Sequence, residues 1–240
     1  MTLGPAIKLD AAALIDLAER AARLSLGQWS VALLRQAFPE TGLETLLALP
    51  VGARDRLVLM IRAQLLSGPL RSEPLCADCG ATYELRLDPV AFGLAGDAPW
   101  PDPGFRAIQI EHRAVRLRPV NLGDLLAVEG EARPEQAARI LSRRVLGEDA
   151  HDLDLDALAQ ALEALDPAAD IWLTTACPEC GASQSVAFEP VHFVAHELRQ
   201  LSHQILRDVV AVARVFHWSE HDILALPEQR RAYYVAEALA

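Results

Sequence analysis

The spacing of apolar residues predicts helices at both ends of the chain. Leu14, Leu17 and Leu24 recur three or four positions apart with charged residues between them, which is typical of an amphipathic helix. Similar spacing predicts four helices in residues 1–69, the first capped by Asp10 and the fourth opened by Pro50. We expect these helices to form a small bundle.

The middle of the chain alternates between strand and helix patterns. Tyr83, Leu85 and Leu87 alternate with charged residues at the period of two that a half-buried strand shows. We also expect a hairpin from 105–110 and 114–118, three short helices in 120–169, and strands at 170–176 and 184–188. A long helix at 191–215 and two short helices, at 219–226 and from 227 onward, complete the pattern.

These patterns divide the chain into four regions and predict an α+β, predominantly helical fold. The regions are an N-terminal helical region (1–69), a first cysteine-containing β region (70–119), a helical insert (120–169), and a second cysteine-containing β region with the C-terminal helices (170–240).

An internal repeat relates the two β regions. Cys76-Ala-Asp-Cys79 and Cys177-Pro-Glu-Cys180 are each followed by Gly-Ala, a strand pattern and a segment with Pro-Val and Phe, at a constant offset of 101 residues. Leu85 and Leu87 align with Val186 and Phe188 at the same offset. We therefore expect two duplicated Cys-knuckle β-hairpins, each leading into a helix at its proline (89 and 190).

The four cysteines predict a metal site. A C-x2-C turn directs two sulfurs at one point, and Zn²⁺ takes four ligands in a tetrahedron with thiolate among the favoured ones. Cys76, Cys79, Cys177 and Cys180 would form one closed site, which is structural because no coordination position stays open. Such a site would staple two distant segments and restrict the unfolded chain. The alternatives are two knuckles completed separately by histidines, an iron–sulfur cluster, disulfides, or no metal.

Composition and charge exclude several classes of function. The 240 residues carry a net charge of −11, which argues against a nucleic-acid binder with a basic face and against docking on anionic lipid. No apolar run is long enough to span a membrane, and the N-terminus lacks the pattern of a signal peptide. We expect a cytoplasmic protein, where metal binding by cysteines is favoured over disulfides.

No catalytic motif is present. His192 and His196 lie four apart, but the order differs from H-E-x-x-H, so polar positions on an amphipathic helix are the favoured interpretation. The acidic run Asp152, Asp154, Asp156 lacks the glycine and closing glutamate of an EF-hand and indicates a helix start. We expect neither enzymatic activity nor a small-molecule substrate.

The C-terminal segment concentrates aromatic and basic residues in a chain with few aromatics. Trp, Tyr and Arg dominate the energetics of protein interfaces, so this segment is a candidate partner surface. The alternative is a capping helix whose aromatic residues pack on the body of the protein. The candidate partner-binding residues are Trp218, Glu220, Arg230, Arg231, Tyr233 and Tyr234.

Residues 168–240 resemble a known family. An Asp-Ile-x-Leu strand enters Cys-Pro-Glu-Cys-Gly, and a tail with Trp-Ser-Glu, Ile-Leu-x-Leu-Pro, Arg-Arg and Tyr follows. This is similar to the T-even-phage-type baseplate hub and hub-assembly proteins found with phage-tail-like contractile injection systems. Residues 43–66 also resemble the longer injection-system versions, while Phe216-His217-Trp218 departs from the usual Tyr-Gly-Trp.

The resemblance implies a structural or chaperone-like assembly role in the baseplate hub, through contacts with baseplate, hub or spike proteins, in the assembled particle or before it forms. The alternative is a zinc-ribbon regulatory or nucleic-acid-associated module, which the acidic charge and the absence of a basic patch in the sequence disfavour.

Overall fold

The computed structural model describes residues 9–88, 102–110, 112–147 and 153–240, which combine α-helices with small antiparallel hairpins. This confirms the predicted mixture of helix and sheet. The described helices are α1 (Ala11–Ala21), α2 (Leu26–Ala37), α3 (Leu43–Leu47), α4 (Val51–Leu65), α5 (Leu122–Val128), α6 (Pro134–Val145), α7 (Leu155–Leu165), α8 (Pro190–Phe216), α9 (Glu220–Leu224) and α10 (Glu228–Leu239). The described strands are β1 (Leu70–Ser72), β2 (Leu85–Leu87), β3 (Arg106–Ile110), β4 (Arg113–Leu117), β5 (Ile171–Ala176) and β6 (Ser183–Phe188).

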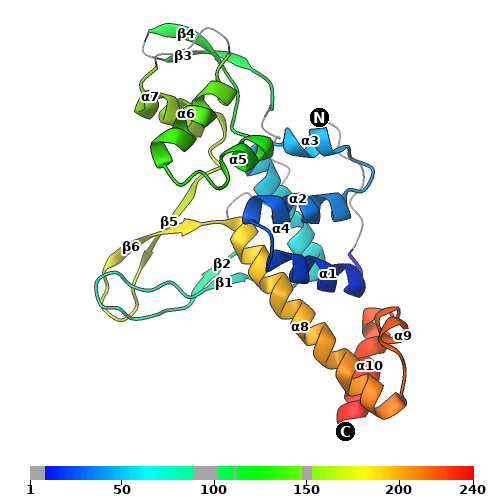
Figure 1. Cartoon of the computed structure of the whole chain (residues 1–240). Helices are drawn as coiled ribbons and strands as arrows, with labels where there is room; N and C mark the ends of the chain where they lie inside the picture. Colours follow the sequence, from blue (N-terminus) through cyan, green and yellow to red (C-terminus); the bar gives the residue numbers. More distant parts are fainter. Residues whose placement is uncertain (1–8, 89–101, 111, 148–152) are drawn as a thin grey trace.

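A helical body forms the centre of the molecule, where α1, α2 and α4 pack with the first part of α8 (Figure 1). Asp10 caps α1 as predicted, because its side chain accepts a hydrogen bond from the N–H of Ala13 at 2.8 Å. The indole of Trp29, at 1 % exposure, fills the space between α1 and α2 and donates to the carbonyl of Leu17 at 3.0 Å. The core of this body takes residues from all four predicted regions, so the four-part division stays a prediction.

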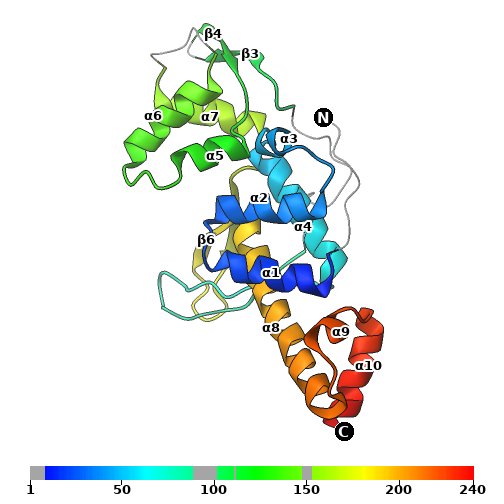
Figure 2. The same ribbon diagram turned by 45° about the vertical axis from the view of Figure 1, so that its right-hand side comes forward.

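A second, smaller core lies beneath the β3–β4 hairpin, where the described residues of 105–165 gather (Figure 2). Ile110, Val115 and Leu117 of the hairpin pack against Val145 of α6 and Leu158 of α7. The carboxylate of Asp124 in α5 ties this unit together.

Helix α8 connects the body to the C-terminal helices. It has 27 residues, which corresponds to about 40 Å at 1.5 Å per residue. Its apolar stripe packs on the body over the first turns and on α9 and α10 over the last turns. It ends at Phe216, and the left-handed backbone of the next residue, His217 (φ 56°), turns the chain back along the helix.

The hairpins β1–β2 and β5–β6 project together to one side of the body (Figure 1). Strand β1 was not predicted from the sequence, and of the strand expected from Thr82, only Leu85–Leu87 is a described strand. The segment 89–92, where the first knuckle was expected to lead into a helix, lies outside the described residues.

Candidate metal centre

The first cysteine pair lies in a tight turn between β1 and β2. The N–H of Cys76 donates to the carbonyl of Ala81 at 2.8 Å, and the N–H of Gly80 donates back to Cys76 at 3.0 Å. Gly80 has φ 71°, a conformation that glycine adopts without the steric cost of a Cβ. This turn directs both sulfurs toward the second hairpin.

The second cysteine pair lies in a turn with the same hydrogen bonds. The N–H of Cys177 donates to Ala182 and that of Gly181 donates to Cys177, both at 2.9 Å. Gly181 has φ 74°. Each hydrogen bond of the first turn therefore recurs 101 positions later in the chain.

The strand pairing follows the same offset. Leu70 pairs with Leu87 in the first hairpin, and Ile171 pairs with Phe188 in the second. The isolated bridge between Leu75 and Thr82 corresponds to the pair Ala176 and Ser183. Applying the offset to the strand predicted at 170–176 would have located β1, which is too short to show a period of its own.

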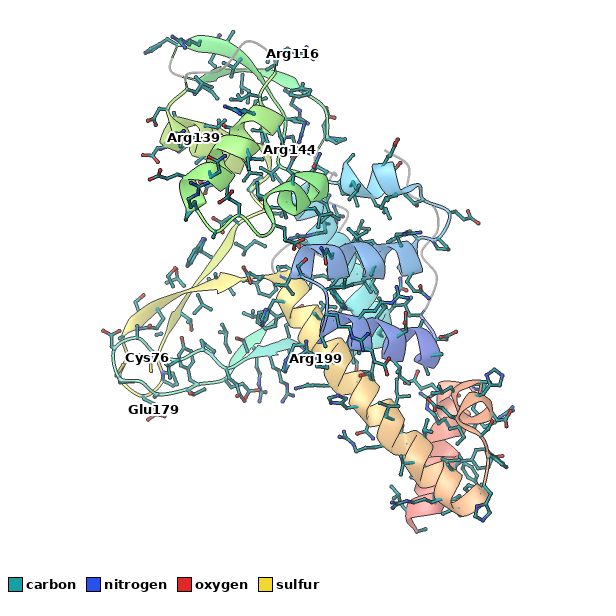
Figure 3. All side chains as sticks on the ribbon, viewed as in Figure 1. Cys76, Arg116, Arg139, Arg144, Glu179 and Arg199 are labelled. Atoms are coloured by element: carbon teal, nitrogen blue, oxygen red, sulfur yellow. The ribbon has the colours of Figure 1, made fainter. Side chains whose placement is uncertain are left out.

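The two turns meet at the tips of the hairpins, where the ligand atoms of the four cysteines lie within 4.8 Å of one another. Figure 3 labels Cys76 and Glu179 at this meeting point, at the far end of the projecting hairpins. The sulfurs of Cys76 and Cys180 are 3.7 Å apart, and those of Cys79 and Cys177 are 3.8 Å apart. All four cysteines are free thiols, since a disulfide requires about 2.05 Å between sulfurs.

These distances fit a tetrahedral metal site. Four sulfurs at about 2.3 Å from one Zn²⁺ lie about 3.8 Å from each other along the edges of the tetrahedron. The Cys76–Cys180 and Cys79–Cys177 distances match that edge, and all four sulfurs lie within 4.8 Å of one another. The four cysteines can therefore bind one metal ion, with two ligands from each hairpin.

Backbone hydrogen bonds and the neighbouring sulfurs give the thiols of Cys76 and Cys180 different pKa values. The N–H of Cys79 donates to the sulfur of Cys76, and with the N–H of Asp78 this lowers the pKa of the Cys76 thiol to about 7 despite its burial. The N–H of Ala182 favours the thiolate of Cys180, but the thiol of Cys79, loss of solvent and the other two cysteines raise the Cys180 pKa to about 12. Since a metal binds thiolates, binding must displace protons from this cluster.

Two side chains that were not predicted from the sequence surround the cysteines. Gln184 of β6 accepts a hydrogen bond from the N–H of Ala77 at 3.1 Å and donates to Asp78 at 2.7 Å, which joins the two hairpins. Tyr83 lies 101 positions earlier and is buried against Cys76 and Cys177. Its hydroxyl has no hydrogen-bond partner in the described part of the chain, and loss of solvent followed by the two nearby sulfurs raises its pKa.

In the described residues, the histidine pair of α8 and the acidic run before α7 do not form a second metal site. Within the described ranges, the four cysteines are the only group of three or more potential ligands that lie close enough to share a metal ion. His192 and His196 are exposed on α8, as the amphipathic interpretation expects. Asp154 caps α7 by accepting from the N–H groups of Asp156 and Ala157 at 3.0 Å, while Asp152 lies outside the described residues.

The C-terminal candidates divide into packed and exposed residues. Trp218 contacts Tyr234 with ring centroids 4.7 Å apart and Phe216 at 5.3 Å, so these rings hold α10 against the end of α8. Arg231 is 8 % exposed. Glu220 and Arg230 are exposed, and Tyr233 is 62 % exposed, so these three side chains are available to a partner.

Comparison of the chain with protein-family models, with curated proteins and with solved structures finds no match. In the part of the chain that the structure describes, no helix combines the length and apolar composition that crossing a membrane requires.

Proposed function

We propose that this protein is a non-catalytic structural or assembly protein of the baseplate hub of a contractile, phage-tail-like injection particle, and that a single Zn²⁺ stabilises it. The observation that carries the structural, metal-stabilised part of the proposal is the cluster of four cysteine sulfurs contributed equally by two hairpins that are far apart in the chain. A site with four thiolate ligands has no open position for a substrate or a reactive water. It is therefore suited to stability rather than to catalysis.

In this proposal, the two hairpins are copies of one Cys-knuckle unit. The shared offset of 101 residues in cysteines, turn hydrogen bonds and strand register supports this interpretation. Zn²⁺ is favoured because the site contains only thiolates at tetrahedral spacing. Bound Zn²⁺ would contribute a closed-shell cation that neutralises thiolates and fixes the hairpins to each other.

Resemblance of the C-terminal region to baseplate hub and hub-assembly proteins supports the assembly role. The exposed side chains Glu220, Arg230 and Tyr233 supply a contact surface at one end of the molecule, away from the metal centre. Tyr and Arg are the residue types that contribute most to binding energy in protein interfaces. Partners in this account are baseplate, hub or spike proteins, and the site of action is the cytoplasm or the assembled particle.

Co-purification tests this function. The protein is co-expressed with the hub and spike proteins of the contractile system encoded beside its gene, and the complex is isolated on a tag. We expect Arg230→Ala with Tyr233→Ala to reduce recovery of the complex strongly. Trp172→Ala, which removes an aromatic side chain of similar exposure (59 %) from β5, should leave recovery unchanged.

Two results would contradict the proposal. One is the absence of sheath, tube and spike genes near the gene for this protein. The other is normal assembly of contractile particles after the gene is deleted.

A further inference from the structure

Helix α8 carries a row of exposed residues along its whole length. At 100° per residue, seven positions fall within an arc of about 80° on one side of the helix. All seven are exposed: His192, His196, Arg199, His203, Arg207, Val210 and Arg214. We call this set the α8 row; it contains no acidic residue and spans about 33 Å at 1.5 Å per residue.

The arginines of the α8 row are not neutralised. In the described residues, Arg199, Arg207 and Arg214 form no ion pair with a carboxylate, and Arg207 donates only to the amide of Gln204 at 2.7 Å. The two acidic residues of α8 lie outside the row. Glu197 pairs with Arg62 at 2.8 Å, and Asp208 accepts from Gln204 at 2.8 Å.

This arrangement is unusual for the chain as a whole, which has 33 acidic and 22 basic residues. Surface arginines in such a chain have many acidic residues available as partners, as in the pair Arg20–Asp16 on α1. A row of arginines and histidines without a carboxylate therefore leaves an attraction for negative charge unsatisfied. The sequence showed no basic patch because the seven residues are spread over 23 positions and converge only on the helix surface.

The described parts of the protein leave the α8 row open. Helices α1, α2, α4, α9 and α10 contact other sides of α8. Figure 1 shows one flank of α8 without a neighbouring helix, and Figure 3 marks Arg199 on the upper part of the same helix. At the N-terminal end of the row, His192 and His196 line a cavity of about 610 Å³ together with Phe193, Arg71 and the carboxylates of Glu73 and Glu197, the second of which is paired with Arg62.

We propose that the α8 row is the docking site for an acidic helical segment of a partner protein. Arginine presents a planar fork that binds a carboxylate with two hydrogen bonds, and a helix with Asp or Glu at every third or fourth position would match the row. Val210, which is 50 % exposed, supplies an apolar contact within the row. The cavity beside His192 and His196 has room for a large side chain of that partner.

An acidic protein helix fits this surface better than a nucleic acid. The row is a single line of charge on a molecule of net charge −11, and the remainder of the molecule repels a long polyanion. A partner helix carries its negative charge on one face only, so it gains the attraction without the same repulsion. The inference concerns a surface separate from the metal centre and from the C-terminal contact residues, so it does not depend on the proposed particle.

The test uses the full-length protein with its metal and a fluorescent helical peptide of about 22 residues, which matches the length of the row. The peptide places glutamates on one face, and a second peptide has the same composition in scrambled order. Binding is followed by fluorescence anisotropy at about 50 mM and about 300 mM NaCl, since screening weakens contacts between exposed charges. The variant Arg207→Glu with Arg214→Glu is compared with Arg139→Glu and Arg143→Glu, which make the same charge change on exposed positions of α6.

We expect the α8 variant to bind the one-faced peptide at least about tenfold more weakly than the unmodified protein, and the α6 variant to lose less than about twofold. Equal losses in both variants would overturn the proposal, because they would indicate a response to net charge alone. Equal binding of the scrambled peptide, failure of the one-faced peptide to bind, or tighter binding of a 20-base-pair DNA duplex would also overturn it.

Discussion

Asp124 shows how one buried side chain can hold several elements in place. Its carboxylate is 0 % exposed and accepts from both terminal nitrogens of Arg118 at 2.6 and 3.0 Å, from Arg144 at 2.7 Å, and from the N–H of Asn121 at 3.0 Å. Burial alone would raise the Asp124 pKa, but these donors hold it below its usual range. The carboxylate therefore joins α5, the end of β4 and α6 as an anion.

Asp124→Asn should lower the free energy of unfolding by about 3–5 kcal/mol, because it leaves the guanidinium of Arg118, whose side chain is only 14 % exposed, without its counter-charge. Since the folded-state pKa is lowered, this stabilisation is present above the pKa of the unfolded chain and is lost as pH falls through the folded-state value. Urea unfolding at neutral pH measures the change. Asp16→Asn, in an exposed pair with Arg20, is the control, with an expected loss below about 1 kcal/mol. Equal losses in the two variants would contradict the role assigned to Asp124.

The stability that Asp55 contributes depends on pH in the opposite direction to that of Asp124. It is 3 % exposed, and burial raises its pKa to about 6 although Arg54 at 2.7 Å favours the anion. The folded state holds the proton more tightly than the unfolded state, so the stability that this proton confers is lost as pH rises from about 4 to about 6. Across this pH range, the shifted pKa of Asp55 changes the free energy of unfolding by about 3 kcal/mol at most.

Asp55→Asn should remove this part of the pH dependence. As pH rises from about 4 to about 6, the unmodified protein should lose stability that the variant does not lose, so the free energy of unfolding of the variant should increase relative to that of the unmodified protein. Above that window the difference should be constant. Urea titrations at several pH values provide the comparison. Parallel curves across the window would show that Asp55 has an ordinary pKa in the folded state.

At the scale of elements, the first turn of α4 lies so close to the segment that follows α7 that only glycine fits. The N–H of Gly52, in the first turn of α4, donates to the carboxylate of Asp166 at 2.9 Å, and Asp166 ends α7. A Cβ at position 52 would collide with that carboxylate and would lie 2.8 Å from the Cβ of Ala168. The glycine is therefore required by the close approach of α4 to Asp166 and Ala168 and not by a special backbone angle.

Gly52→Ala should destabilise the fold by about 1–3 kcal/mol, even though alanine favours helix formation over glycine by about 1 kcal/mol. Gly42→Ala is a matched control, because position 42 has open space around it and a φ of −60° that alanine adopts readily. Thermal unfolding of the two variants should show a lower midpoint only for the first. A midpoint for Gly52→Ala equal to that of Gly42→Ala would mean that Asp166 and Ala168 can move away from α4 without cost.

Most elements were predictable from the sequence because they are long enough to show a period. The apolar spacing in α8, the capping residue of α1 and the β3–β4 hairpin all appear in the structure where they were expected. Strand β1 has three residues and carries no usable period. The contacts of Asp124, Arg62 and Gln184 join positions that local patterns do not relate, so only the assembled fold reveals them.

The ligands of the candidate metal centre were predictable from the sequence, but the side chains around them were not. The cysteine spacing identified all four potential ligands, because a C-x2-C turn is a local structure with a fixed geometry. Tyr83 and Gln184 were not identified, although the offset of 101 residues relates them to each other. The sequence pattern also did not predict the cationic α8 row, since the row depends on the orientation of the whole helix.

At the scale of the whole molecule, the described helices pack around a main hydrophobic core, a second core beneath β3–β4 and a third at the end of α8, and a pair of hairpins projects from the body (Figure 1). Arg62 fixes the base of the projection, since its guanidinium binds Glu197 of α8 and the carbonyls of Gly68 and Pro69 just before β1. The tips lie away from the main core, and in the described residues they are connected by the hydrogen bonds of Gln184 to Ala77 and Asp78, by Tyr83 and by the four cysteines. A metal ion at the tips would therefore determine whether the two hairpins act as one rigid arm.

Native mass spectrometry of the protein purified without chelator tests most directly whether the four cysteines bind one structural Zn²⁺. The account predicts a mass increase equal to one Zn²⁺ per chain, with loss of that increase in Cys177→Ser and a lower unfolding free energy in the same variant. A control variant, Ser183→Ala, changes a neighbouring exposed residue that is not a ligand and should keep the metal. A stably folded chain that carries no metal would contradict the central claim, as would a Cys177→Ser variant with unchanged stability.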